Sequence, residues 1–68
     1  MTFRELLKQK DIHGAQLARK LGVDRSVVSN WVRGKNFPRP IYLTKIAEIL
    51  GISLTDLLNA LSKTKEQA

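Results

Sequence analysis

Apolar residues recur along this chain at intervals of three and four residues, the spacing that lines one face of an α-helix. The pattern occupies residues 3–10, 15–21, 25–33, 40–50 and 54–61. A strand would instead show strict alternation of apolar and polar residues, and no stretch of useful length alternates in this way. The pattern therefore predicts an all-α fold, a bundle of five short helices.

Capping residues stand where these helices are expected to begin. Thr2-Phe3-Arg4-Glu5 has the T-x-x-E form of a capping box, in which the two outer side chains each accept a backbone N–H. Asp24 and Ser53 are suited to cap the third and fifth helices. Pro40 is well tolerated at the start of the fourth. Glycine tolerates the backbone conformation that ends many helices, and it follows the second, third and fourth helices, at Gly22, Gly34 and Gly51.

Sixty-eight residues leave room for one domain. Residues 62–68 carry no apolar side chain before the terminal alanine, so we expect a frayed tail there and a single domain over residues 1–61. The apolar spacing of the last two helices also predicts which of their side chains enter the core. These are Leu43, Ile46, Ala47, Leu50, Leu54, Leu57 and Leu58.

The net charge of +6 is concentrated in one half of the chain. Residues 1–39 hold nine Lys and Arg against three Asp and Glu, whereas residues 40–68 hold three of each. A surface that only kept the protein soluble would mix both signs along the chain. The asymmetry favours a polyanionic partner, such as nucleic acid or a membrane surface, over plain solubility.

Several classes of function lack the residues they need. The chain has no cysteine and one histidine, which excludes a disulfide framework and a thiolate metal site and leaves no serine–histidine–carboxylate triad. No acid–base or nucleophile constellation is present, so we expect no enzyme, no cofactor and no metal. Apolar runs are too short for a membrane span or a secretory signal, so we expect no membrane partner and a cytoplasmic location.

Residues 25–33 separate into two faces at about 100° per residue. The apolar face carries Val27, Val28, Trp31 and Val32. The polar face carries Arg25, Ser26, Ser29, Asn30 and Arg33, with no acidic side chain. An ordinary amphipathic surface helix would also show two faces, but serine and asparagine reduce helix propensity. Short polar groups suit a surface that approaches base edges, and the angles place the single tryptophan in the core.

The segment before this helix has the composition of a tight helix–helix crossing. Ala18 is small enough for two backbones to approach, and Gly22 permits the turn. At residues 16–24, 28–31 and 34–35 the chain resembles the lambda repressor and Cro (XRE-like) family of helix-turn-helix DNA-binding domains. The resemblance continues through residues 46–58 and spans roughly residues 3–61, with the helix-turn-helix at the second and third helices.

The resemblance implies that the third helix enters the major groove of double-stranded DNA. It implies base contacts from Arg25, Ser26, Ser29 and Asn30. It implies phosphate contacts from His13, Gln16, Arg33, Lys35, Asn36 and Arg39. From the residues alone, Arg25 could instead bind phosphate or pair with Asp24, Ser26 could bind phosphate, and His13 could be a weak helix cap.

One departure from the family concerns the start of the second helix. Many relatives place a glutamine there that braces the recognition helix, and this chain has Gly14. Either Gln16 or His13 replaces that brace, or Arg25 is held less rigidly.

The resemblance also implies a homodimer that represses transcription from a palindromic operator, in a prokaryotic or phage-encoded system associated with the nucleoid. Residues 40–61 carry more apolar side chains than the core can bury, and those left over are Ile41, Tyr42, Ile49 and Leu61. In relatives, the link before the fourth helix and the fifth helix contact their copies in the dimer. The interface candidates are Phe37, Pro38, Tyr42 and Leu61. An antitoxin or protein-interaction module, with a toxin or other protein partner, is the alternative. RNA binding is less favoured because the usual exposed aromatic residues are missing.

Overall fold

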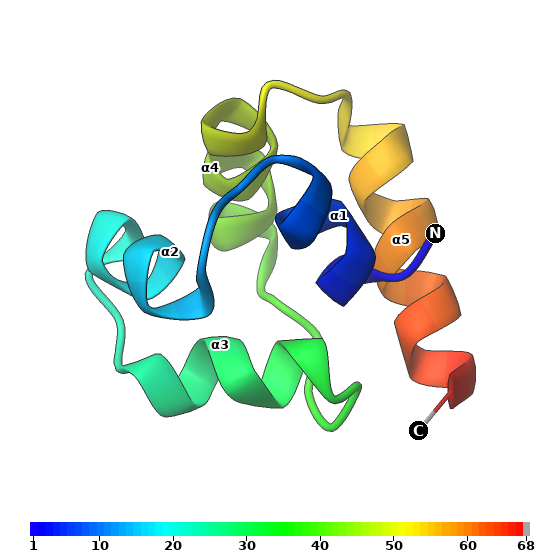
Figure 1. Cartoon of the computed structure of the whole chain (residues 1–68), viewed down its shortest axis with the longest axis horizontal. Helices are drawn as coiled ribbons and strands as arrows, with labels where there is room; N and C mark the ends of the chain where they lie inside the picture. The colour runs from blue at the N-terminus through cyan, green and yellow to red at the C-terminus, as the bar shows by residue number, and fades with distance from the viewer. Residues whose placement is uncertain (68) are drawn as a thin grey trace.

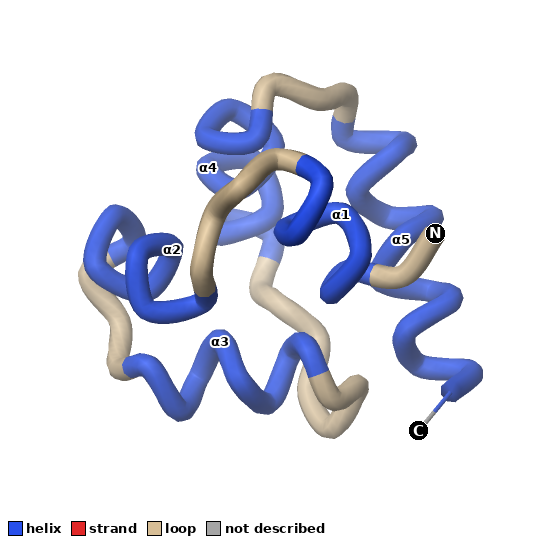
Figure 2. The backbone as a smooth tube through the Cα atoms, viewed as in Figure 1, coloured by secondary structure: helices blue, strands red, loops and turns tan. Residues whose placement is uncertain are grey.

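The computed structural model describes the backbone of residues 1–67 and the side chains of residues 1–63. This part of the chain holds five helices and no strand, as the apolar spacing predicted. They are α1 (Phe3–Gln9), α2 (Gly14–Leu21), α3 (Arg25–Val32), α4 (Pro40–Leu50) and α5 (Leu54–Gln67). Figure 1 shows α3 along one edge of the bundle, with α1 and α2 above it, α4 on the far side and α5 along the right. Figure 2 shows that loops and turns join every pair of consecutive helices.

The predicted helix caps are present. At α1, Thr2 N–H donates to Glu5 Oε1 at 2.8 Å, and Glu5 N–H donates to Thr2 Oγ1 at 3.2 Å. The hydrogen bond from the Thr2 N–H is the main cause that lowers the pKa of Glu5 from its ordinary value. At α5, Asp56 N–H donates to Ser53 Oγ at 3.1 Å. The capping box at residues 2–5 therefore satisfies two backbone donors that the first turn of α1 leaves unpaired.

The last helix is longer than predicted. The sequence placed its end at residue 61 and a frayed tail over residues 62–68, whereas the structure continues α5 to Gln67. Lysine, glutamate and glutamine are good helix formers, and they make up most of residues 63–67. Residue 68 lies outside the described residues. Fraying of this tail stays a prediction.

One hydrophobic core joins all five helices. Its largest fully buried side chains are Phe3, Leu17, Val28, Ile46 and Leu57. Burial of apolar surface at this scale is the main force that stabilises so short a chain. Five of the seven core residues predicted for the last two helices are buried, namely Leu43, Ile46, Ala47, Leu50 and Leu57.

The prediction was wrong about which face of α5 enters the core. Leu54 and Leu58 were predicted to be buried, but they are 45% and 38% exposed. The inward face carries Leu57, Ala60 and Leu61 instead. Both sets fit the three-and-four spacing, because Leu57 and Leu61 belong to either stripe. Ala60 is buried on this inward face, and α5 packs against α1, α3 and α4, so the neighbouring helices select the second stripe.

Candidate nucleic-acid interface

The second and third helices pack as a helix-turn-helix. Gly22 ends α2 with a left-handed backbone, φ 72°, and the Val23 N–H donates to the Ala18 carbonyl at 3.0 Å. This bond closes the αL turn that reverses the chain at the end of a helix. Ala18 is buried, and so are Val28 and Trp31 on the facing side of α3. The predicted roles of the small residue at the crossing and of the glycine in the turn are confirmed.

Trp31 belongs to the core, as its helical angle predicted. Its side chain is buried, and its ring lies 5.8 Å from the Tyr42 ring, centroid to centroid, at an interplanar angle of 44°. Tilted aromatic pairs at this separation are favourable beyond the area they bury. The pair ties the end of α3 to the start of α4, so the indole is not available to stack on a base.

The outward face of α3 carries the polar residues that the sequence assigned to base reading. The side chains of Arg25 and Ser26 are exposed, and those of Ser29 and Asn30 are half-buried on the same helix. Val28 and Trp31 are buried on the opposite face, which fixes the direction in which this polar face points. The face carries no acidic side chain within α3. A helix of this width and polarity fits the major groove of B-DNA.

Asp24 organises the first turn of α3. One carboxylate oxygen accepts the Arg25 N–H at 2.9 Å, and the other accepts the Ser26 hydroxyl at 2.9 Å. A serine hydroxyl has one proton to donate, and this bond uses it. In this arrangement Ser26 accepts hydrogen bonds but does not donate them, and phosphate oxygens have none to give. The geometry therefore favours a base amino group over phosphate as the contact of Ser26.

A loop with exposed cations follows α3. The Arg33 N–H donates to the Ser29 carbonyl at 3.0 Å, and the Lys35 N–H donates to the Asn30 carbonyl at 2.9 Å. These backbone bonds hold the loop against the end of α3. Four side chains predicted to contact phosphate are exposed there, Arg33, Lys35, Asn36 and Arg39.

The other predicted phosphate contacts lie at the start of α2. His13 is the N-cap residue, and its N–H donates to Gln16 Oε1 at 2.9 Å. Both side chains are exposed. The side-chain carbonyl of Gln16 therefore caps its own helix rather than bracing α3. A Cβ built at Gly14 would lie 3.6 Å from Val28 Cγ1, an ordinary contact, so α2 passes close to α3 without a polar brace at this position.

The four residues predicted for a dimer interface differ in exposure. Phe37 is 51% exposed and Tyr42 is half-buried, whereas Pro38 and Leu61 are buried within the chain's own fold. The inference that Leu61 is surplus to the core is wrong, because the inward stripe of α5 contains it. Among the described residues, the most exposed large apolar side chain is Ile41, at 62%, which was surplus to the predicted core but was not among the interface candidates.

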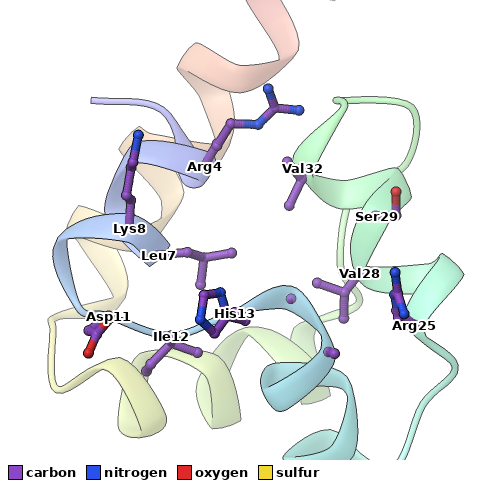
Figure 3. A pocket seen from close by; sticks show the side chains of 12 residues that line it. Arg4, Leu7, Lys8, Asp11, Ile12, His13, Arg25, Val28, Ser29 and Val32 are labelled. Atoms are coloured by element: carbon purple, nitrogen blue, oxygen red, sulfur yellow. The ribbon is translucent and has the colours of Figure 1, made fainter.

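A cleft beside α3 was not foreseen. It has a volume of about 680 Å³ and lies between α1, the α1–α2 loop, the start of α2 and α3 (Figure 3). Its aliphatic lining comes from Leu7, Ile12, Val28 and Val32. Its polar lining comes from Arg4, Lys8, Asp11, His13, Arg25 and Ser29. The sequence contained one signal for it, the spacing of four between the two cations of α1, but the facing side of the cleft comes from other helices.

Other kinds of site find little support. No group of three or more His, Cys, Asp and Glu side chains gathers in the described part of the chain. None of the helices described combines the length and the apolar composition that a membrane crossing requires.

The fold and this surface define a helix-turn-helix DNA-binding domain. A family model described as helix-turn-helix matches residues 3–57. The chain belongs to this family, the Cro-type (XRE) helix-turn-helix domains, as the resemblance implied. Domains of this family are typical of regulators that are not enzymes. Comparisons with curated proteins and with solved structures found no match.

Proposed function

We propose that this protein is a sequence-specific transcriptional regulator that reads double-stranded DNA through α3. The observation that carries the proposal is the outward face of α3, which is polar, holds no carboxylate and stands opposite the buried Val28 and Trp31. Phosphates repel carboxylates, and base edges in the major groove accept and donate hydrogen bonds to short polar side chains. The α3 face has no carboxylate that phosphates would repel, and it carries short polar side chains that can bond to base edges.

Each residue of the face has a contact that its chemistry favours. Arg25 donates two hydrogen bonds to O6 and N7 of guanine, and Asn30 pairs with N6 and N7 of adenine. Ser26 accepts from a base amino group while Asp24 holds its proton. Ser29 supplies a fourth contact. The phosphate contacts, which fix register without reading sequence, come from His13, Gln16, Arg33, Lys35, Asn36 and Arg39.

The regulator acts as a homodimer on an inverted repeat. One recognition helix reads too few base pairs to find a site among many competitors, and two copies related by a two-fold axis read twice as many. The exposed ring of Phe37, at the link before α4, and the neighbouring Tyr42 support contact between the copies. The half-site centres are then about 34–36 Å apart, one turn of the duplex. The dimer represses by occupying its operator.

Selection of binding sites from a random duplex pool tests this function. We expect the selected sequences to converge on an inverted repeat, bound with a slope of log affinity against log salt on the order of −6 to −10. A slope near zero, or selected sequences without any consensus, would contradict sequence-specific DNA binding.

Two variants then separate reading from positioning on the selected site. Asn30→Ala should cost about 1–3 kcal/mol and relax the preference at one base pair. Lys35→Ala should weaken all sequences about equally and reduce the salt slope by about one per subunit. Uniform weakening by Asn30→Ala would remove that residue from base reading. Convergence on a site without two-fold symmetry, bound by one chain in sedimentation, would refute the homodimer.

A further inference from the structure

The cleft beside α3 brings together cations that the sequence leaves far apart. Arg4 and Lys8 are four residues apart and so lie on one face of α1. Both line the cleft, and across it stand His13 at the start of α2 and Arg25 at the start of α3 (Figure 3). Asp11 is the single acidic residue of the lining. With histidine neutral, three cations against one carboxylate give the lining a net charge of +2.

The cations of α1 are available for a partner. The side chains of Arg4 and Lys8 are exposed, and neither makes an ion pair with another residue in the part of the chain that the structure describes. Two exposed cations one turn apart repel each other, because like charges at this spacing destabilise a helix slightly. An anion between them removes that cost.

The cleft and the loop after α3 lie at different positions along α3. In Figure 1 the loop of residues 33–39 extends below the C-terminal end of α3, whereas α1 lies above α3. The major groove is bordered by one sugar-phosphate strand on each side. Most of the phosphate contacts predicted from the sequence lie in this loop, and the cleft places further cations beside α3 at a different position.

We propose that the cleft receives the sugar-phosphate backbone of the strand that borders α3 on the α1 side, with Arg4 and Lys8 as phosphate contacts. The proposal rests on the proposed function, because it requires α3 in the major groove. A DNA strand alternates anionic phosphates with largely apolar deoxyribose. The cations around the cleft match the phosphates, and Ile12 and Val32, which are half-buried in its aliphatic lining, match the sugars.

The salt dependence of DNA binding tests this contact. The double variant Arg4→Gln with Lys8→Gln removes both charges and keeps good helix formers in α1. Its matched control is Arg19→Gln with Lys20→Gln, which removes two exposed charges from the last turn of α2, outside the cleft. Each phosphate contact contributes about 0.9 to the slope. We therefore expect the α1 variant to reduce the slope by about 1.8 per bound subunit and the α2 control to change it little.

In affinity, the wild type should lose about tenfold more than the α1 variant for each bound subunit between about 50 and 200 mM salt. The exchange Arg4→Lys with Lys8→Arg keeps both charges and should keep the wild-type slope. Circular dichroism and thermal unfolding confirm that each variant is folded. Equal slopes for the α1 variant and the wild type, or equal losses in the α1 and α2 variants, would overturn the proposal.

A third variant, Arg33→Gln with Lys35→Gln on the loop side, distinguishes failure of this contact from failure of the function. If the loop variant reduces the slope and the α1 variant does not, the cleft contact is wrong and DNA binding stands. If neither variant changes the slope, the proposed function fails together with the contact.

Discussion

The register of α5 can be tested with two adjacent leucines. Leu57 is fully buried and Leu58 is 38% exposed, although the sequence pattern alone assigned both to the core. Replacing a buried leucine by alanine removes its transfer free energy and leaves a cavity, at a cost of about 3–5 kcal/mol when little collapse occurs. A partly exposed leucine leaves no closed cavity, so we expect Leu58→Ala to cost about 1 kcal/mol. The two changes remove the same atoms, so their difference isolates burial.

The expected loss at Leu57 is large for a domain of this size. A stability of about 0.05–0.15 kcal/mol per residue gives roughly 3–10 kcal/mol for the whole chain. The free energy of unfolding of both variants is measured by urea titration, monitored by circular dichroism and by the fluorescence of Trp31, the single tryptophan. If Leu57→Ala is already unfolded without urea, its loss of stability lies in the upper part of the range expected for a buried leucine. A loss in Leu58→Ala equal to or larger than that in Leu57→Ala would refute the assigned face of α5.

Further predictions concern substitutions at four positions. Gly22→Ala should lower the free energy of unfolding by about 1–2 kcal/mol, because φ is 72° there. Gly14→Ala should instead raise it by roughly 0.5 kcal/mol, since the added Cβ makes an ordinary contact. Equal effects of the two substitutions in thermal unfolding would contradict the left-handed turn at Gly22. The pKa of Glu5 is lowered in the fold, so its contribution is present above the ordinary value of 4.5 and is lost as pH falls through the folded pKa. Urea midpoints at neutral and acidic pH should therefore differ less in Glu5→Gln than in the wild type, and identical pH dependence would argue against the capping contact. Phe37→Asp should weaken self-association and operator binding in sedimentation while changing stability by less than about 0.5 kcal/mol; full operator affinity would remove this ring from the interface.

The parts of the fold that follow local rules could be predicted from the sequence. The helix starts at Thr2 and Asp24 depend on side chains that bond to their own first turns, and the stop at Gly22 depends on one residue's backbone freedom. The polar face of α3 is likewise a property of one helix. Its outward direction follows from Val28 and Trp31 within the same segment, so no knowledge of other helices was needed.

The parts that depend on several helices could not be predicted in this way. The stripe of α5 that enters the core depends on the helices packed against α5, namely α1, α3 and α4, and the spacing within α5 does not contain that information. The cleft depends on how α1, α2 and α3 are placed relative to one another. From the sequence alone, Arg4 and Lys8 could be counted in the net charge but could not be located beside α3. Exposure of Phe37 likewise depends on how the link before α4 lies on the bundle.

The same contrast between contacts within one helix and contacts between helices applies to how α3 is positioned. Gly14 supplies no polar brace from α2, and Gln16 uses its carbonyl to cap its own helix. The orientation of α3 in the bundle therefore rests on apolar packing around Val28, because the carboxylate of Asp24 caps the first turn of its own helix. Packing fixes the helix axis, but it does not fix an exposed side chain at the first helical position. Arg25 is such an exposed side chain, so ordering it in the proposed DNA complex would cost entropy.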